Sequence, residues 1–252
     1  MEGRRKREKM IITIDGSACT GKSTSAQALA KLLGYRYLNT GAMFRGIAYF
    51  VNSKGLTEEK QIREAIKDVT MEFNDINGQS HLFLNGEDIT EQTKQKVSNG
   101  IIPLTSKIAT IPAVREKLLQ LQRHIARDGG FIVEGRDTGT AVFPDADWKF
   151  FLNASIEVKV KRLFKLLSPE EKRNLTLNDA RKIIEDIDAR DITRTVGPLV
   201  KAKDAVLCDN SESPNAEHDA IVMWYYITKT EEMHQNLTML DKRSSLTYKA
   251  TL

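Results

Sequence analysis

Short apolar runs alternate with stretches of helical periodicity along most of this chain. The apolar runs, which predict buried strands, lie at 10–14, 35–38, 131–134, 148–152 and 205–208. The periodic stretches, in which apolar residues recur every three or four positions and predict helices, lie at 41–51, 115–126, 156–167, 177–189 and 215–227. Strands alternating with helices favour an α/β fold, a parallel sheet with flanking helices on both faces.

The alternation is interrupted after residue 57. Residues 58–68 predict a helix, and residues 70–76 and 81–84 predict two strands joined around Asn77-Gly78, a dipeptide typical of tight hairpins. A local antiparallel ribbon in a chain of βα units predicts an inserted lobe. Further on, Ser168-Pro169-Glu170-Glu171 fits either the start of a helix or a mobile joint.

The loop after the first predicted strand carries the clearest chemistry. Residues 16–23 read Gly-Ser-Ala-Cys-Thr-Gly-Lys-Ser, the phosphate-binding P-loop, between a strand and a helix. Glycines let backbone N–H groups approach phosphate closely, and the helix N-terminus favours an anion. Lys22 is expected to reach the β and γ phosphates, and Ser23 to ligate Mg²⁺. The residues expected to bind ATP are Gly16, Ser17, Ala18, Cys19, Thr20, Gly21, Lys22, Ser23 and Thr24.

Composition and charge limit the class of protein and its expected partners. The chain has 252 residues, 40% hydrophobic and 29% charged, with no membrane span expected. Its net charge of +4 arises largely in residues 1–9, a basic leader that we interpret as a frayed terminus without a nucleic-acid or membrane contact. Cys19 and Cys208 are far apart and suggest no disulfide framework, so a cytoplasmic location is expected. Residues 228–252 are polar and fit a disordered tail.

A P-loop alone does not distinguish an ATPase, a GTPase, a small kinase or a motor. A regulatory GTPase requires a guanine-reading Asn-Lys-x-Asp segment late in the sheet, and the last strand is followed by Asp209-Asn210-Ser211 instead. What is distinctive is a set of arginines, several near strand ends, suited to binding phosphate and a base. They are Arg45, Arg115, Arg136, Arg190 and Arg194.

Four segments together resemble the bacterial cytidylate kinase family. They are residues 38–45 (Leu-Asn-Thr-Gly-Ala-Met-Phe-Arg), 84–90, 134–146 (beginning Glu-Gly-Arg-Asp-Thr-Gly-Thr) and 190–194. The resemblance covers roughly residues 10–227. It implies a P-loop kinase domain with a monophosphate-binding insert at about 57–110 and a short lid at about 155–195. It also implies Mg²⁺-dependent transfer of the γ-phosphoryl group of ATP to CMP or dCMP by a protein that we expect to be a monomer.

The resemblance assigns roles to individual residues. Lys22, Arg136 and Arg194 would be catalytic. The substrate-binding residues would be Thr40, Arg45, Ser106, Arg115, Arg136, Asp137, Asp191 and Arg194. Asp137 would accept a hydrogen bond from the exocyclic amine of cytosine, where uracil has a carbonyl, so CMP should be preferred to UMP. Taken without the resemblance, Arg45 and Arg115 fit surface ion pairs equally well, and Ser106 fits a helix cap.

The chain also departs from the family pattern. Asn39 stands where aspartate is usual, Leu163 and Ile187 stand where arginines are common, and Lys159 replaces another arginine. A less cationic lid predicts reduced turnover or altered closure. Two alternatives therefore stay open: a kinase for UMP or dTMP, and a nucleotide-binding regulator with weakened transfer.

Overall fold

The computed structural model describes residues 9–77, 79–94 and 101–229. The basic leader expected at 1–9, except Lys9, lies outside these ranges, as does the expected tail beyond residue 229. The helix expected to end at Ile227 continues through residue 229.

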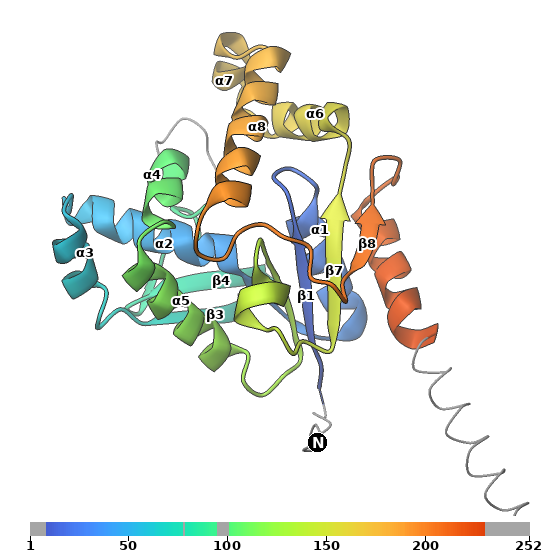
Figure 1. The fold of residues 1–252 in the computed structure, drawn as a ribbon, viewed down its shortest axis with the longest axis horizontal. Coiled ribbons are helices and arrows are strands. Elements are labelled where there is room, and N and C mark those ends of the chain that lie inside the picture. The colour runs from blue at the N-terminus through green and yellow to red at the C-terminus, as the bar shows by residue number, and fades with distance from the viewer. Residues whose placement is uncertain (1–8, 78, 95–100, 230–252) are drawn as a thin grey trace, which may run out of the picture.

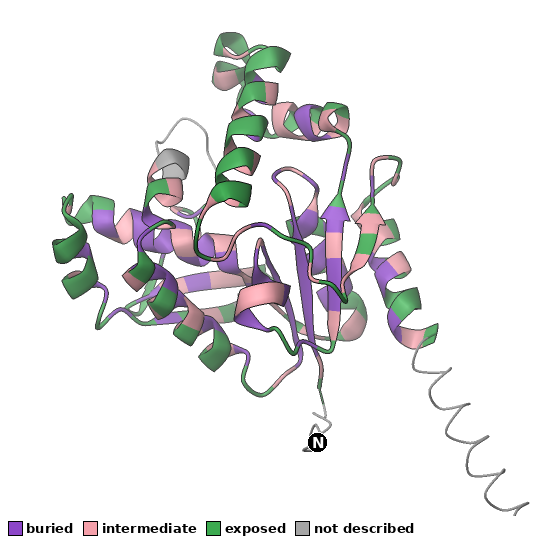
Figure 2. Cartoon of the chain, in the orientation of Figure 1, coloured by how far each residue is buried: buried purple, intermediate pink, exposed green. Residues whose placement is uncertain are grey.

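A parallel sheet forms the centre of the molecule. Within the described residues it has five strands, in the order β2-β6-β1-β7-β8, and every pair is parallel. All residues of β1 and β6 are buried, as expected for strands covered on both faces (Figure 2). The strands are β1 (Ile11–Gly16), β2 (Arg36–Asn39), β6 (Phe131–Gly135), β7 (Trp148–Asn153) and β8 (Val206–Asp209).

Helices cover both faces of this sheet, which confirms the α/β prediction. On one face, Ile12 and Ile14 pack with α1 (Lys22–Leu33) and the helix of residues 216–229. On the other, Leu38 and Val133 pack with α2 (Thr40–Ser53) and α5 (Pro112–Ile125). Each fully buried large apolar side chain stabilises the fold by about 1.5–3 kcal/mol relative to exposure.

The inserted lobe contains a second, antiparallel sheet of β3 (Met71–Ile76), β4 (Gln79–Leu84) and β5 (Glu87–Asp88). The hairpin prediction is confirmed, with Ile76 opposite Gln79. The helix expected at 58–68 is α3 (Glu59–Ala65), and α4 (Ile101–Ile108) was not predicted. Two residues are too few to show alternation in β5, and Pro103 obscures the helical pattern of α4.

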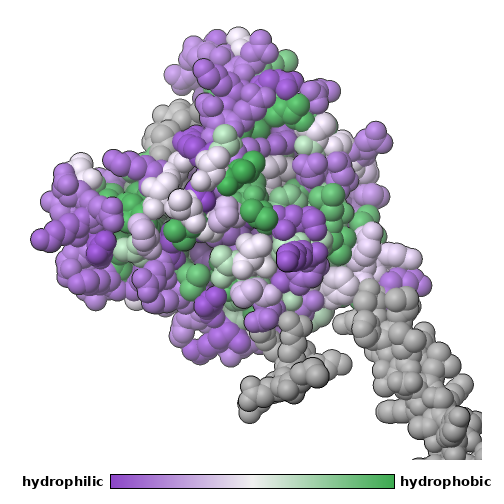
Figure 3. Space-filling view, in the orientation of Figure 1, coloured by the Kyte–Doolittle hydropathy of each residue, from purple (hydrophilic) through white to green (hydrophobic). Residues whose placement is uncertain are grey.

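Three helices project beyond the carboxyl ends of β1 and β7 (Figure 1). They are α6 (Ile156–Leu166), α7 (Pro169–Asn174) and α8 (Leu177–Thr193). Ser168 and Glu171 form a capping box, so the segment at 168–171 starts a helix. Figure 3 shows that the surface of these projecting helices is mostly hydrophilic, with some hydrophobic residues exposed. No helix in the described ranges is both long and apolar enough to cross a bilayer.

Candidate active site

The loop between β1 and α1 has the backbone expected of a phosphate cradle. Gly21 caps α1 in the left-handed conformation, with φ of 87°. Gly16 lies so close to β7 that a Cβ atom there would stand 2.2 Å from the carbonyl oxygen of Leu152. Both glycines are therefore required by geometry, one for its conformation and one for its close approach.

Lys22 lies inside this loop. Its Nζ donates to the carbonyl oxygen of Ser17 at 2.6 Å and lies 3.4 Å from the Thr20 hydroxyl. Burial, with a further contribution from the positive charge of Arg136, lowers the pKa of Lys22 to about 7. Ser23 and Thr24 are exposed in the first turn of α1, where a bound anion would meet free backbone N–H groups.

Asp191 joins two of the predicted substrate-binding arginines. The Nε of Arg136, which follows β6, donates to Asp191 Oδ2 at 2.7 Å. The Nη1 of Arg194, which ends α8, donates to Asp191 Oδ1 at 3.2 Å. Although burial opposes the charged form of Arg136, the carboxylates of Asp191, Glu134 and Asp188 together raise the pKa of this arginine. Asp191 therefore holds the two guanidinium groups in place.

Asp137 and Arg115 form a buried ion pair beside these groups, with each side chain only 9% exposed. Arg194 Nη2 lies 3.6 Å from the second oxygen of Asp137, and Arg115 lies over the ring of Phe44. The chain after α8 crosses this pair at Gly197, where a Cβ atom would stand 1.9 Å from Asp137 Oδ2. Only glycine fits there.

Arg45 is buried in α2 and donates from Nε to the carbonyl oxygen of Thr93 at 2.5 Å. Thr40, at the start of the same helix, donates to the carbonyl oxygen of Glu134 at 2.8 Å. The burial of Arg45 and Arg115 rules out the alternative that they form surface ion pairs. Burial, and then the charge of Arg136, lower the pKa of Arg45 to about 10, although Glu134 opposes this.

Arg136 therefore stands at the centre of a cationic cluster. Burial is the largest cause of the lowered pKa of Lys22, Arg45 and Arg194, and the charge of Arg136 adds to it in each case. Such mutual effects require these groups to be close in space. Arg45, Arg136 and Arg194, from three separate stretches of sequence, thus lie near one another and near Lys22 of the P-loop.

Ser106 connects two elements of the predicted site. It is inside α4, so it caps no helix there, and its hydroxyl accepts a hydrogen bond from Arg190 Nη1 at 3.1 Å. This contact joins the inserted lobe to α8, one of the projecting helices. Ser106 and Arg190 thus connect the expected monophosphate-binding insert with the expected lid.

Sequence reasoning missed Asp15, a buried carboxylate at the end of β1. One oxygen accepts from the N–H and hydroxyl of Thr138 at 2.9 and 2.8 Å, and the other from the N–H of Gly139 at 2.7 Å. These donors start the short π-helical segment η2 (Thr138–Val142), directly after Asp137. An acidic residue in a buried apolar strand must be paired, and that rule could have singled it out.

A chain of partly buried polar groups was also missed. Tyr37 donates to Glu134 Oε1 at 2.5 Å, and Asn39 Nδ2 donates to the Tyr37 hydroxyl at 3.1 Å. Burial, followed by the charge of Glu134, raises the pKa of Tyr37, which keeps this donor protonated. Asn39 also caps α2, its side-chain oxygen accepting from Ala42 N–H at 2.8 Å. The asparagine that replaces the usual aspartate is therefore accommodated structurally.

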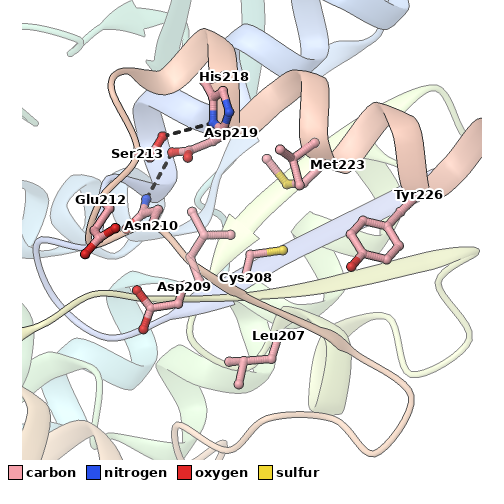
Figure 4. A pocket seen from close by; sticks show the side chains of 12 residues that line it. Leu207, Cys208, Asp209, Asn210, Glu212, Ser213, His218, Asp219, Met223 and Tyr226 are labelled. Atoms are coloured by element: carbon pink, nitrogen blue, oxygen red, sulfur yellow. Dashed lines mark hydrogen bonds between the residues drawn. The ribbon is translucent and has the colours of Figure 1, made fainter.

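A pocket of about 350 Å³ lies between β8 and the helix of residues 216–229 (Figure 4). It includes none of the predicted site residues, but Asn210 connects it to the P-loop. Asn210 Nδ2 donates to the carbonyl oxygen of Thr20 at 2.8 Å and to Asp219 at 3.0 Å. Arg162 of α6 donates to the same Thr20 oxygen at 3.0 Å.

The profile of the cytidylate kinase family matches residues 12–224. The chain belongs to this family. The cytidylate kinase of Pseudothermotoga lettingae is 39% identical over 203 residues, covering 81% of this chain and 87% of that protein. The cytidylate kinase of Geobacter sulfurreducens is 40% identical with the same coverage. A bifunctional pantoate ligase/cytidylate kinase of Prochlorococcus marinus matches 78% of this chain and 38% of its own length at 39% identity.

Among solved structures, the shikimate kinase of Bacteroides thetaiotaomicron has a TM-score of 0.45 at 10% identity, over 87% of this chain and 98% of that one. Membership of the cytidylate kinase family therefore rests on sequence, and the α/β arrangement on the structure itself.

Proposed function

We propose that this protein transfers the γ-phosphoryl group of ATP to CMP or dCMP, giving CDP or dCDP. Family membership supports the reaction. The observation that carries the proposal is the cationic cluster around Arg136, which faces the P-loop lysine. The triphosphate of ATP and the phosphate of CMP repel one another, and a set of fixed cations between them stabilises the charge that spreads over the transferred group.

The donor side is formed by the P-loop, whose N–H groups and Lys22 would hold the triphosphate of ATP. Ser23 would contribute a hydroxyl ligand to Mg²⁺. Among the described residues no three His, Cys, Asp or Glu side chains gather as a metal site. A single hydroxyl ligand from the protein suits a magnesium ion held mainly by phosphate and water. When bound, the ion would neutralise and orient the phosphates.

On the acceptor side, Arg45, Arg136 and Arg194 would bind the phosphate of the monophosphate. Its attacking oxygen is already ionised near neutral pH, so the reaction needs orientation and charge neutralisation more than a general base. The arginine fork can hold two phosphate oxygens at once. Asp191 would hold Arg136 and Arg194 in fixed positions relative to each other. The insert would serve as the acceptor lobe, and the projecting helices as the lid.

The Arg115–Asp137 pair would read the base. A carboxylate has lone pairs for more than one donor, so Asp137 can bind Arg115 and still accept from the cytosine amine. Uracil presents a carbonyl at that position, which would face the carboxylate unpaired and repelled. The Ser106 hydroxyl accepts from Arg190 and can still donate its own hydrogen to an acceptor on the base.

A coupled assay with CMP, dCMP, UMP, dTMP and AMP as acceptors tests this proposal. We expect turnover with CMP and dCMP and little with the others. Faster turnover with UMP or dTMP would contradict it in favour of another monophosphate kinase. Tight ATP binding with no transfer to any acceptor would favour the regulator.

We expect the protein to act as a monomer in the cytoplasm. Cys19 and Cys208 are both free, which supports a reducing compartment.

A further inference from the structure

One carboxylate joins the P-loop to two of the projecting helices. Asp188 of α8 accepts from the backbone N–H of Ala18, the third residue of the P-loop, at 2.7 Å through Oδ1. Its Oδ2 accepts from Lys159 Nζ of α6 at 2.6 Å. The Asp188 and Lys159 side chains are only 15% and 9% exposed. A carboxylate with an N–H donor on one oxygen and an ammonium on the other is a strong, directional contact when shielded from water.

Apolar packing surrounds this contact. Ala18, Val160, Ala180 and Ile184 form a buried cluster, and Cys19, Leu163 and Ile187 pack against it. Leu163 and Ile187 are the two positions at which the family commonly has arginines. In this chain they bring α6 and α8 onto the tip of the P-loop instead. The departures thus have a physical account, because apolar side chains at these positions extend the packing between the projecting helices and the loop.

The charge balance fits a position beside a triphosphate. An unpaired carboxylate this close to the cradle would repel phosphate, but Lys159 neutralises it. Lys159 and Asp188 both influence the pKa of Cys19, the next loop residue after Ala18, in opposite directions. The pair therefore anchors the loop without adding net negative charge.

We propose that Asp188 is a positioning residue of the ATP site. It holds the P-loop from α8 through the Ala18 N–H, so the projecting helices engage the loop before nucleotide binds. It touches no reacting atom. Its effect reaches ATP through the orientation of the neighbouring loop N–H groups, which must all point at one anion. The kinetic part of this role rests on the proposed kinase function, whereas the structural part does not.

Two substitutions separate the contacts of Asp188. Asp188→Ala removes both, and we expect it to raise the KM for ATP about tenfold while changing the KM for CMP much less. Asp188→Asn keeps an oxygen for the Ala18 N–H and loses the ion pair, so we expect an increase of about threefold. Asp186→Ala, at an exposed position on the same helix, is the matched control and should leave both constants unchanged.

Two readouts that do not depend on turnover accompany the kinetics: calorimetric ATP affinity, and hydrogen exchange of α6, α8 and the P-loop without nucleotide. We expect Asp188→Ala to weaken ATP binding and to accelerate exchange in all three segments, with the melting temperature of the sheet domain retained. If the wild type phosphorylates no acceptor but Asp188→Ala still weakens ATP binding, the proposed function fails and this inference stands. Faster exchange with unchanged ATP affinity would reduce Asp188 to a structural contact and overturn the inference, as would no change in either.

Discussion

Lys22 has the most strongly lowered pKa of the cationic cluster, about 7 against an ordinary 10.5. Arg45 is lowered from 12.5 to about 10. Both shifts arise mainly from burial, and both make the cluster a place where positive charge is costly until an anion arrives. A bound triphosphate reverses this cost, because it favours the charged form of Lys22.

ATP affinity should therefore fall as the pH rises. Above pH 7 the free protein loses the Lys22 proton, whereas the ATP complex retains it, so binding takes up a proton and weakens with increasing pH. The window from about pH 7.5 to 9.5 is suitable because the terminal phosphate of ATP is already ionised there. Calorimetry in buffers of different ionisation enthalpy measures the uptake directly.

The matched control is Lys22→Met, which keeps most of the side-chain volume without a titrating group. It should bind ATP more weakly and lose the proton uptake. It should also lose nearly all transfer while retaining the wild-type far-UV circular dichroism. Equal proton uptake in the two proteins would show that another group titrates.

Asp15 links two functional elements, the P-loop strand and the loop that carries Arg136 and Asp137. Its three hydrogen bonds fix the start of η2 and hence the direction in which Asp137 leaves the sheet. Burial raises the pKa of Asp15, although the Gly139 and Thr138 donors oppose this shift.

We expect Asp15→Asn to impair the acceptor side more than the donor side. The new amide turns one acceptor into a donor that faces backbone N–H, which should cost about 2–4 kcal/mol of stability. The KM for CMP should rise about tenfold or more, with a smaller change for ATP. Steady-state kinetics measures the two KM values, and chemical denaturation measures the stability. Thr138→Val removes one of the three hydrogen bonds, so it should raise the KM for CMP more than that for ATP, but by a smaller factor than Asp15→Asn. An equal rise for both substrates would contradict a specific role.

The segment after α8 forms a cover over the Arg115–Asp137 pair, and Gly197 is its point of closest approach. Gly197→Ala would place a methyl group in space filled by both side chains and would strain a backbone with φ of 59°. We expect a loss of about 1–3 kcal/mol in stability and a raised KM for CMP. Gly55→Ala, at another left-handed glycine with open space around it, controls for backbone strain alone. Equal effects of the two substitutions on CMP would contradict this role.

At the scale of the whole molecule, periodicity predicted the central strands and most helices because burial on both sheet faces imposes it. It missed β5 and α4, which are short or interrupted. The P-loop could be read from sequence because its function depends on consecutive backbone groups. Asp15 and Asp188 could not be assigned partners, since these lie 123 and 170 residues away in sequence and meet only after folding.

The most direct test of the account is base choice by Asp137. The ratio of kcat/KM for CMP to that for UMP should be measured in the wild type and in Asp137→Asn, whose amide can donate to the uracil carbonyl. We predict a strong preference for CMP in the wild type and a ratio lowered at least about tenfold in the variant, with ATP affinity little changed. A folded variant with the wild-type ratio would contradict the assignment of this pair as the reader of the base.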